Sequence, residues 1–131
     1  YQTAKEVLKK YPEVKGILGT SSFDAPGTAR AIDELGLKGK VFTAGTGMPA
    51  ANAQILKDGS VSTLTLWDPA NAGYAMASLA TKILNGETIE DGVNLGVEGY
   101  ESMHFSSGST KVLEGTGWLK ITKDNVDSLG F

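Results

Sequence analysis

Several residue types on which whole classes of chemistry depend are absent or nearly absent. The 131-residue sequence has no cysteine, which excludes disulfides, thiolate zinc sites, Fe–S clusters and cysteine nucleophiles. Its single histidine, His104, excludes any mechanism that needs two. No apolar run approaches the length of about 18 residues that a membrane span needs. Twelve basic residues against fifteen acidic ones give a net charge of −3, so the sequence lacks the basic excess of a nucleic-acid binder or a polybasic membrane anchor.

The residues that are present describe one ordinary folded domain. The length falls within the usual range of roughly 100–200 residues per domain, and 40% hydrophobic with 21% charged residues is typical of a chain with a core. The 17 glycines stand singly at the ends of apolar runs, which indicates the turns and caps of many short elements. Because the sequence starts at Tyr1, inside a predicted helix, we expect a processed product or a piece of a longer protein.

Helical and strand-like periodicity alternate over the first 85 residues. Apolar residues recur at helical spacing over 3–11, 26–35, 49–57 and 71–84, and short apolar runs typical of buried strands cover 14–19, 40–44 and 61–67. Thr3 and Asp24 are candidate helix N-caps, and Asn85-Gly86 is a stop signal. This alternation predicts an α/β fold, a three-layer parallel sheet with flanking helices and right-handed crossovers.

The pattern changes after Gly86. The following stretch is rich in glycine and has no long periodic segment. It predicts an irregular C-terminal tail, with short strands or extended arms at 93–97, 102–105 and 111–113, a strand at 118–121 and a last short turn that ends at Phe131. We expect a tail of this kind to lean on another part of the parent protein.

Ligands of an open parallel sheet bind beyond the carboxyl ends of its strands, and this rule selects three loops. The first contains Thr20, Ser21, Ser22, Phe23 and Asp24. Hydroxyls together with an aromatic ring suit a polyol, because the hydroxyls bond its polar edge and the ring covers an apolar face. The alternative for Asp24 is that it caps the helix that follows.

The second loop matches the pattern G-x-G-x-x-A at Gly45, Gly47 and Ala50, after a strand and before a helix. Asp68 follows about 20 residues later, where a ribose-binding carboxylate would stand. These residues support an alternative hypothesis, a small Rossmann-like nucleotide-binding enzyme. Pro49 weakens it, because proline lacks an N–H that a pyrophosphate would use.

The third loop begins with Trp67, which is either part of a core or a stacking platform for a ligand. Asp68, before Pro69, is either the N-cap of the long helix or a ligand acceptor.

Catalytic groups find little support in the sequence. His104 lies between two apolar residues, which is more typical of a packed or surface histidine than of a base. The serines at 106–109 form a flexible loop rather than a nucleophile elbow. Glu87, Glu90 and Asp91 crowd a loop that is best interpreted as solvated.

Several runs resemble the second-lobe signature of type I periplasmic sugar-binding proteins. They are YPEVKGIL at 11–18, APGTARA at 25–31 and KVFTAGTG at 40–47, followed in order by KDG at 57–59 and WDP at 67–69. Leu66-Trp67-Asp68 and the C-terminal residues 125–131 are most similar to the rhamnose- and autoinducer-2-binding branch. The resemblance covers nearly the whole chain but only about the last 40% of a typical member.

The resemblance implies a two-lobed Venus-flytrap protein that delivers a small sugar-like ligand to an ABC permease in the membrane. The parent would be periplasmic, or extracellular and lipid-anchored. Residues 1–66 would be second-lobe βα units, 67–92 a hinge crossover with a helix packed on the first lobe, and 93–131 a return crossover and tail. Catalysis, cofactors, metals and nucleic acid are not implied. The same fold serves as the effector domain of sugar-responsive repressors, a further alternative that would require a DNA-binding headpiece.

The resemblance also implies which residues contact the ligand. Thr20 and Ser22 match loop positions that meet the ligand, Trp67 stands where many relatives carry a glutamine, and Gly47 where many carry an aspartate. The candidate ligand-binding set is Thr20, Ser21, Ser22, Phe23, Gly47, Trp67 and Asp68. Because the first lobe would supply the remaining contacts, we expect this chain alone to bind its sugar weakly or not at all. We also expect the long helix to expose an apolar face that favours a dimer or a domain swap.

Overall fold

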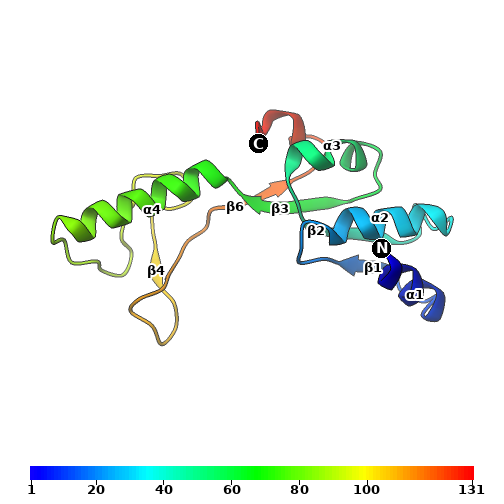
Figure 1. Cartoon of the computed structure of the whole chain (residues 1–131), viewed down its shortest axis with the longest axis horizontal. Helices are drawn as coiled ribbons and strands as arrows, with labels where there is room; N and C mark the ends of the chain where they lie inside the picture. Colours follow the sequence, from blue (N-terminus) through cyan, green and yellow to red (C-terminus); the bar gives the residue numbers. More distant parts are fainter. The chain divides into compact units, whose positions relative to one another are not determined.

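The computed structural model describes residues 1–131, which form two compact units (Figure 1). Unit 1 is Tyr1–Leu66 with Lys120–Phe131, and unit 2 is Trp67–Leu119. The elements in chain order are α1 (Gln2–Lys10), β1 (Gly16–Leu18), α2 (Asp24–Glu34), β2 (Phe42–Thr46), α3 (Pro49–Lys57), β3 (Thr63–Trp67), α4 (Pro69–Leu84), β4 (His104–Phe105), β5 (Leu113–Glu114), β6 (Trp118–Ile121) and the 3₁₀ turn η1 (Val126–Ser128). None of the helices combines the length and the apolar character that crossing a membrane requires.

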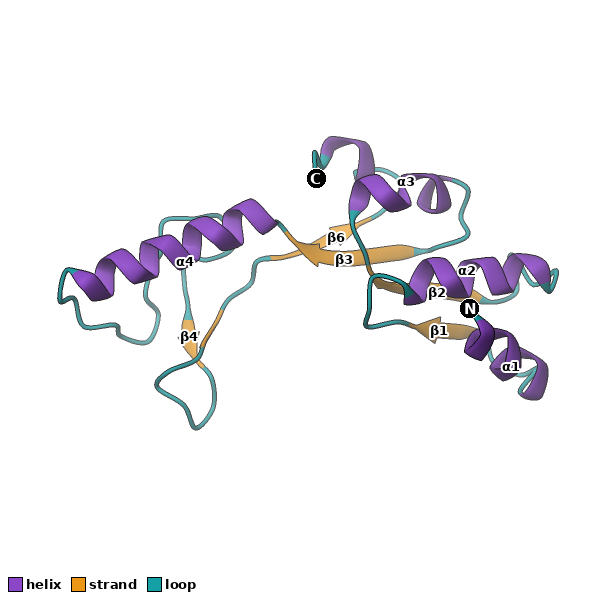
Figure 2. Ribbon diagram, viewed as in Figure 1, coloured by secondary structure: helices purple, strands orange, loops and turns teal.

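The main sheet has the strand order β1-β2-β3-β6. β1 pairs with β2 in parallel, with Gly16 opposite Phe42, and β2 pairs with β3 in parallel, with Ala44 opposite Thr63. The connections are α2 and α3, so each parallel pair is joined by a crossover helix (Figure 2). The predicted α/β class with helices beside a mostly parallel sheet is therefore confirmed.

The core of unit 1 lies where the helices meet the first two strands. Leu8 of α1, Ile32 of α2 and Val41 before β2 form a buried cluster against which Ile17 and Leu35 pack. α2 contacts both β1 and β2, and α1 packs against α2. Helical spacing on α1 and α2 brings these residues to one side of each helix, so the apolar pattern predicts the packing.

Both boundaries of β2 differ from the sequence prediction. β2 was expected at 40–44, but it begins at Phe42, because the N–H groups of Lys40 and Val41 both donate to the carbonyl of Leu37 in a turn. Its last residues, Gly45 and Thr46, pair with β3 instead of belonging to the loop.

The predicted cap at Thr3 is wrong. α1 begins at Gln2, so Thr3 lies inside the helix and the N-cap position is Tyr1.

Unit 2 is built on α4. Ala75 of α4, Leu95 and Met103 form its buried cluster, with Leu79 and Tyr100 packed against it. The two-stranded antiparallel sheet of β4 and β5 and an isolated antiparallel bridge between Val93 and Met103 hold the segment that follows α4. The short strands predicted in the tail are therefore present, although each is only two residues long or a single bridge.

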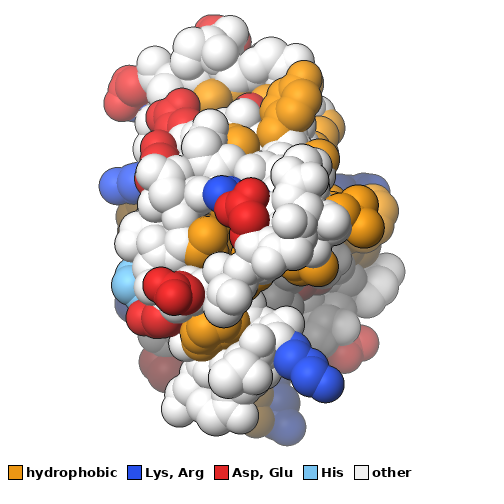
Figure 3. Space-filling view, turned by 90° about the vertical axis from the view of Figure 1, so that its left-hand side faces the viewer, with side chains coloured by type: hydrophobic (Ala, Val, Ile, Leu, Met, Phe, Trp, Pro, Cys, Tyr) orange, Lys and Arg blue, Asp and Glu red, His pale blue; other side chains and the backbone are white.

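Asp91 and the single histidine, His104, form contacts that stabilise the segment after α4. His104 Nδ1 lies 3.0 Å from Asp91 Oδ2, and Asp91 Oδ1 accepts from the Phe105 N–H at 2.7 Å. These contacts lower the pKa of Asp91, the His104 hydrogen bond being the larger cause. In Figure 3 the imidazole (pale blue) is at the surface beside acidic side chains. His104 is a surface residue, as the sequence indicated, and its pairing with Asp91 is structural.

Glu34 of α2 accepts from three donors, and two of them, Tyr1 and Lys5, connect α1 with α2. It accepts hydrogen bonds from the Tyr1 hydroxyl, from Lys5 Nζ at 2.9 Å and from Arg30 Nε at 3.0 Å. Together they lower the pKa of Glu34 from its ordinary value of 4.5 to about 2, with the Tyr1 hydrogen bond as the largest cause.

We predict an acid-sensitive contribution to stability from Glu34. Its folded pKa is depressed, so the contribution is complete above pH 4.5 and is lost as the pH falls towards about 2. An NMR titration of the side-chain carboxyl should give a midpoint near 2. The variant Glu34→Gln should lose less stability than the wild type over the same pH interval, and equal losses would contradict this role.

Candidate functional site

The loop after β1 is held in one shape by its own aspartate. Asp24 Oδ2 accepts from the backbone N–H groups of Thr20 at 3.0 Å and Ser21 at 2.9 Å. Ser21 Oγ accepts from the Phe23 N–H at 3.3 Å, and the Gly19 N–H donates to the carbonyl of Ala44 in β2 at 2.9 Å. Asp24 is therefore not the predicted N-cap, a position that Phe23 occupies. It lies in the first turn of α2 and fixes the loop that precedes it.

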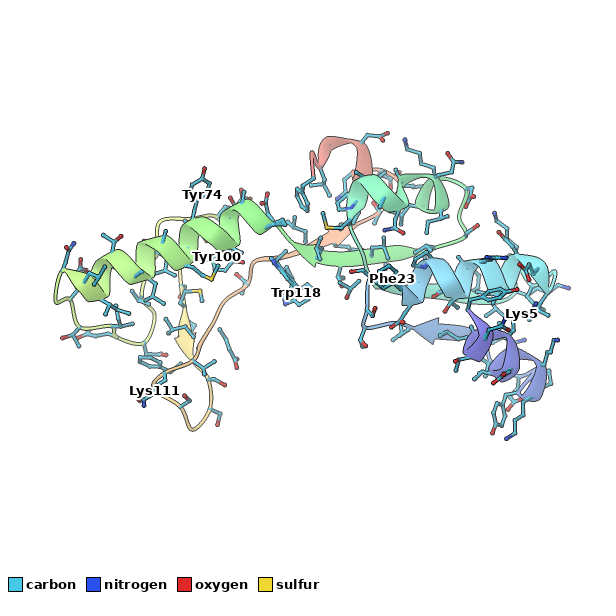
Figure 4. The ribbon with its side chains drawn as sticks, in the orientation of Figure 1. Lys5, Phe23, Tyr74, Tyr100, Lys111 and Trp118 are labelled. Carbon is cyan, nitrogen blue, oxygen red and sulfur yellow. The ribbon has the colours of Figure 1, made fainter.

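This fixed loop presents polar and aromatic groups to solvent. The hydroxyls of Thr20 and Ser22 are exposed and enter none of the hydrogen bonds that fix the loop. The Phe23 side chain is 84% exposed at the start of α2 (Figure 4). A large exposed ring at a fixed position is unusual for a surface loop, and together with two free hydroxyls it forms a surface suited to a polyol.

Glycine is required where this loop approaches β2. A Cβ at Gly45 would lie 2.8 Å from the Gly19 carbonyl oxygen, and a Cβ at Gly19 would lie 2.3 Å from that of Asp24. Side chains at these two positions would separate the loop from the strand. The glycines thus serve close packing, and Gly45 is a residue of β2 rather than of a phosphate loop.

The loop after β2 differs from the expected dinucleotide site. Gly47 is buried, and a Cβ there would lie 3.0 Å from Asn52 Nδ2 and 3.1 Å from Leu64 Cδ1. At the N-terminus of α3, the Ala50 N–H donates to the carbonyl of Phe131 at 3.3 Å. The helix end that a pyrophosphate would use is thus partly engaged by the C-terminus of the chain.

Asp68 caps α4, which is one of the two roles that the sequence allowed. Its Oδ1 accepts from the N–H of Ala70 at 2.7 Å and of Asn71 at 3.2 Å.

Trp67 is half-exposed and paired with a second tryptophan. Trp67 ends β3, Trp118 begins β6, and these strands are neighbours in the sheet. The two ring centroids lie 5.3 Å apart with the planes at 87°, an edge-to-face arrangement worth about 0.5–1.5 kcal/mol beyond the area it buries. Sequence reasoning missed Trp118 because it gave no pairing between β3 and β6. The only available signal was that both tryptophans stand at ends of predicted strands.

No group of three or more His, Asp or Glu side chains is positioned to hold a metal ion. Two of the three acidic residues at 87–91 pair with different partners: Glu87 with Lys82 and Asp91 with His104.

The alternating elements and the open carboxyl edge of the sheet match a known family. The family model described as "Periplasmic binding protein domain" matches residues 1–88, two thirds of the chain. The chain belongs to this family. Members of this family are non-enzymatic solute binders. The family match therefore does not support the nucleotide-binding enzyme alternative.

Solved structures share the fold over almost the whole chain. A sugar ABC transporter protein from Actinomyces odontolyticus is 28% identical, with a TM-score of 0.78 over 99% of this chain and 41% of its own. AraP, an arabinose-binding protein from Geobacillus stearothermophilus, is 25% identical, with a TM-score of 0.69 over 99% of this chain and 40% of its own. LsrB from Clostridium saccharobutylicum, solved in complex with AI-2, is 21% identical, with a TM-score of 0.70 over 99% of this chain and 44% of its own.

The periplasmic binding protein chain described here thus spans about two fifths of the length of these structures. At 21% identity the likeness to LsrB shows the fold alone, so the resemblance to the rhamnose and autoinducer-2 branch stays a hypothesis about the ligand.

We predict that the Asp68 cap depends on a side-chain acceptor rather than on charge. Asp68→Ala should lower the free energy of unfolding by about 0.5–2 kcal/mol, whereas Asp68→Asn, also a good N-cap, should lower it much less. Urea unfolding, followed by the circular dichroism of the helices at roughly 222 nm, measures the free energy of unfolding of both variants. Equal losses in the two variants would show that charge, and not capping, is the important property.

Proposed function

We propose that this chain is part of a solute-binding protein located outside the cytoplasm. This protein would capture a sugar-like polyol for import by an ABC transporter. The observation that carries the proposal is the loop after β1, where the Asp24 carboxylate fixes two free hydroxyls and an exposed aromatic ring at the end of a parallel strand. Loops at that edge are where open α/β sheets bind ligands.

The proposed contacts have distinct roles. Thr20, Ser21 and Ser22 would exchange hydrogen bonds with ligand hydroxyls, and Phe23 would cover an apolar face of the sugar ring. Gly47 is buried without a side chain, so its contribution would come from the backbone.

In unit 2 the proposed contact surface is Trp67. Asp68 would contribute through the carboxylate oxygen that does not cap α4, since both cap bonds go to Oδ1.

The ligand class follows from the chemistry of the loop. Serine and threonine hydroxyls are neutral and both donate and accept, as a polyol requires, whereas an ionic solute would need an opposite charge. The Asp24 carboxylate is turned to backbone donors and is not offered to a ligand. AraP is an arabinose-binding protein and other structures of this fold were solved with D-fucose and D-allose, which supports a monosaccharide without selecting one.

We predict weak but saturable binding of a monosaccharide by this chain, with a Kd on the order of 1 mM or weaker because part of the contact set is absent. Saturation-transfer NMR against a panel of aldoses, ketoses and 6-deoxy sugars detects binding in this range. Ser22→Ala should weaken binding of the best ligand. Ser62→Ala, at an exposed serine just before the amino end of β3, is the matched control. Transfer to no sugar of the panel would contradict the proposal.

Another part of the proposal concerns what covers α4. Tyr74, Met76, Ile83 and Leu84 are all more than half exposed on this one helix, and apolar side chains (orange) lie at the surface in the view along this end of unit 2 (Figure 3). In a complete binding protein the first lobe would cover them. In this chain by itself we propose that a second copy does so.

We predict association that depends on concentration. Sedimentation velocity should show a mass above that of the monomer as concentration rises, and Ile83→Lys should suppress it by placing a charge in the interface. Val112→Lys changes an equally exposed residue of the hairpin loop and should have no effect. A monomer at every concentration would contradict a second copy as the occupant.

A further inference from the structure

Trp118 lines a hollow that the proposed ligand contacts do not include. The hollow, of about 200 Å³, lies within unit 2 between the rings of Trp67, Trp118 and Tyr100, the Met103 thioether and the backbone at Gly115 and Gly117. Trp118 is 58% exposed and Trp67 43%, so the edge-to-face pair is open on the side of the hollow.

The hollow is built by two glycines that let aromatic and sulfur groups approach the chain. A Cβ at Gly117 would lie 2.8 Å from Tyr100 Cζ and 2.9 Å from its hydroxyl oxygen. A Cβ at Gly115 would lie 2.5 Å from Met103 Sδ. Any side chain at either position would therefore displace the Tyr100 ring or Met103, and the three-ring arrangement depends on both glycines.

The lining selects a neutral ligand with an apolar face. No lysine, arginine, aspartate or glutamate is among the lining residues, so nothing in the hollow balances a charge. Two indole rings at right angles form a corner that CH groups can contact on two sides, while the Tyr100 hydroxyl and the glycine peptide groups offer hydrogen bonds. A monosaccharide has this combination of a CH-bearing face and a polar rim.

We infer that Trp118 is a ligand-contacting residue, which together with Trp67 and Tyr100 forms an aromatic corner for the CH-bearing face of a monosaccharide. This inference rests on the proposed function and adds three features to it: a second tryptophan, a tyrosine and the two glycines that position them. It also assigns specificity, because sugars with a contiguous CH face, 6-deoxy sugars among them, should bind better than sugars whose hydroxyls interrupt that face.

Circular dichroism offers a direct test, because Trp67 and Trp118 are the only tryptophans of the chain. Edge-to-face indoles this close should give an exciton couplet in the far-ultraviolet circular dichroism spectrum, and either Trp67→Phe or Trp118→Phe should remove it. A wild-type spectrum without the couplet would show that the corner does not exist in solution and would overturn the inference.

The binding test uses the best sugar of the NMR panel and its change in tryptophan emission. Trp118→Ala should weaken binding by about three- to tenfold and Gly117→Ala should weaken it similarly, whereas Trp118→Phe should keep most of it. Tyr74→Ala is the matched control, because Tyr74 is 67% exposed on α4 and points away from the hollow (Figure 4). Each variant is first compared with the wild type by thermal unfolding.

A measurement on the unmodified chain keeps the inference falsifiable if a variant fails to fold. Selective irradiation of the indole protons should transfer saturation to the CH protons of the bound sugar. If Ser22→Ala weakens binding while Trp118→Ala does not and indole irradiation transfers nothing, the aromatic corner is wrong and the proposed function stands. If the wild type binds no sugar, both are wrong.

Discussion

The close approach of the chain at Gly19 and Gly45 is the constraint on which the hydroxyl-bearing loop depends. Because Gly19 and Gly45 lack a Cβ, the loop leaves β1 within hydrogen-bonding distance of β2. The Asp24 side chain can then approach the backbone of the loop. The Asp24 carboxylate then satisfies two consecutive backbone N–H groups. A loop of five polar and aromatic residues would otherwise sample many conformations. Ligand binding would then have to offset the conformational entropy lost when the loop becomes ordered. Here that cost is met in the folding of unit 1.

The order of the elements could be predicted from the sequence, and some of their boundaries could not. α3 and β6 have the expected bounds, because proline and lysine-aspartate-glycine mark the ends of α3 and an isolated apolar run forms β6. β2 begins two residues later than predicted because the first two N–H groups of the apolar run, those of Lys40 and Val41, donate to the carbonyl of Leu37 in a turn. Local periodicity contains no information on that competition, since it depends on the register with β1.

The candidate site was predictable only where it is local in sequence. The hydroxyls and the ring at 20–23 are consecutive, so their meeting at one loop required only the position of a strand end. The corner of Trp67, Tyr100 and Trp118 joins three distant segments, and it requires knowing that β3 and β6 are neighbours. In the same way, Asp91 and His104 were both noticed as single residues, but their contact arises from the turn that brings β4 back to the loop after α4.

The two aspartates nearest the proposed contacts show why the ligand should be uncharged. Asp24 and Asp68 were each open to two interpretations, and each directs an oxygen to a pair of backbone N–H groups: Asp24 to those of a loop and Asp68 to those of a helix start. A carboxylate that accepts two such hydrogen bonds would lose them if it turned to a cation. Apart from the Asp68 oxygen that does not cap α4, the groups left for recognition are hydroxyls, peptide groups and aromatic rings. Such groups discriminate by the pattern of CH and OH on a ligand, and since none of them brings a full charge, affinity has to come from enclosure.

A chain that spans about two fifths of its solved relatives provides only part of that enclosure. Fixed geometry with weak affinity is therefore the expected combination for this chain.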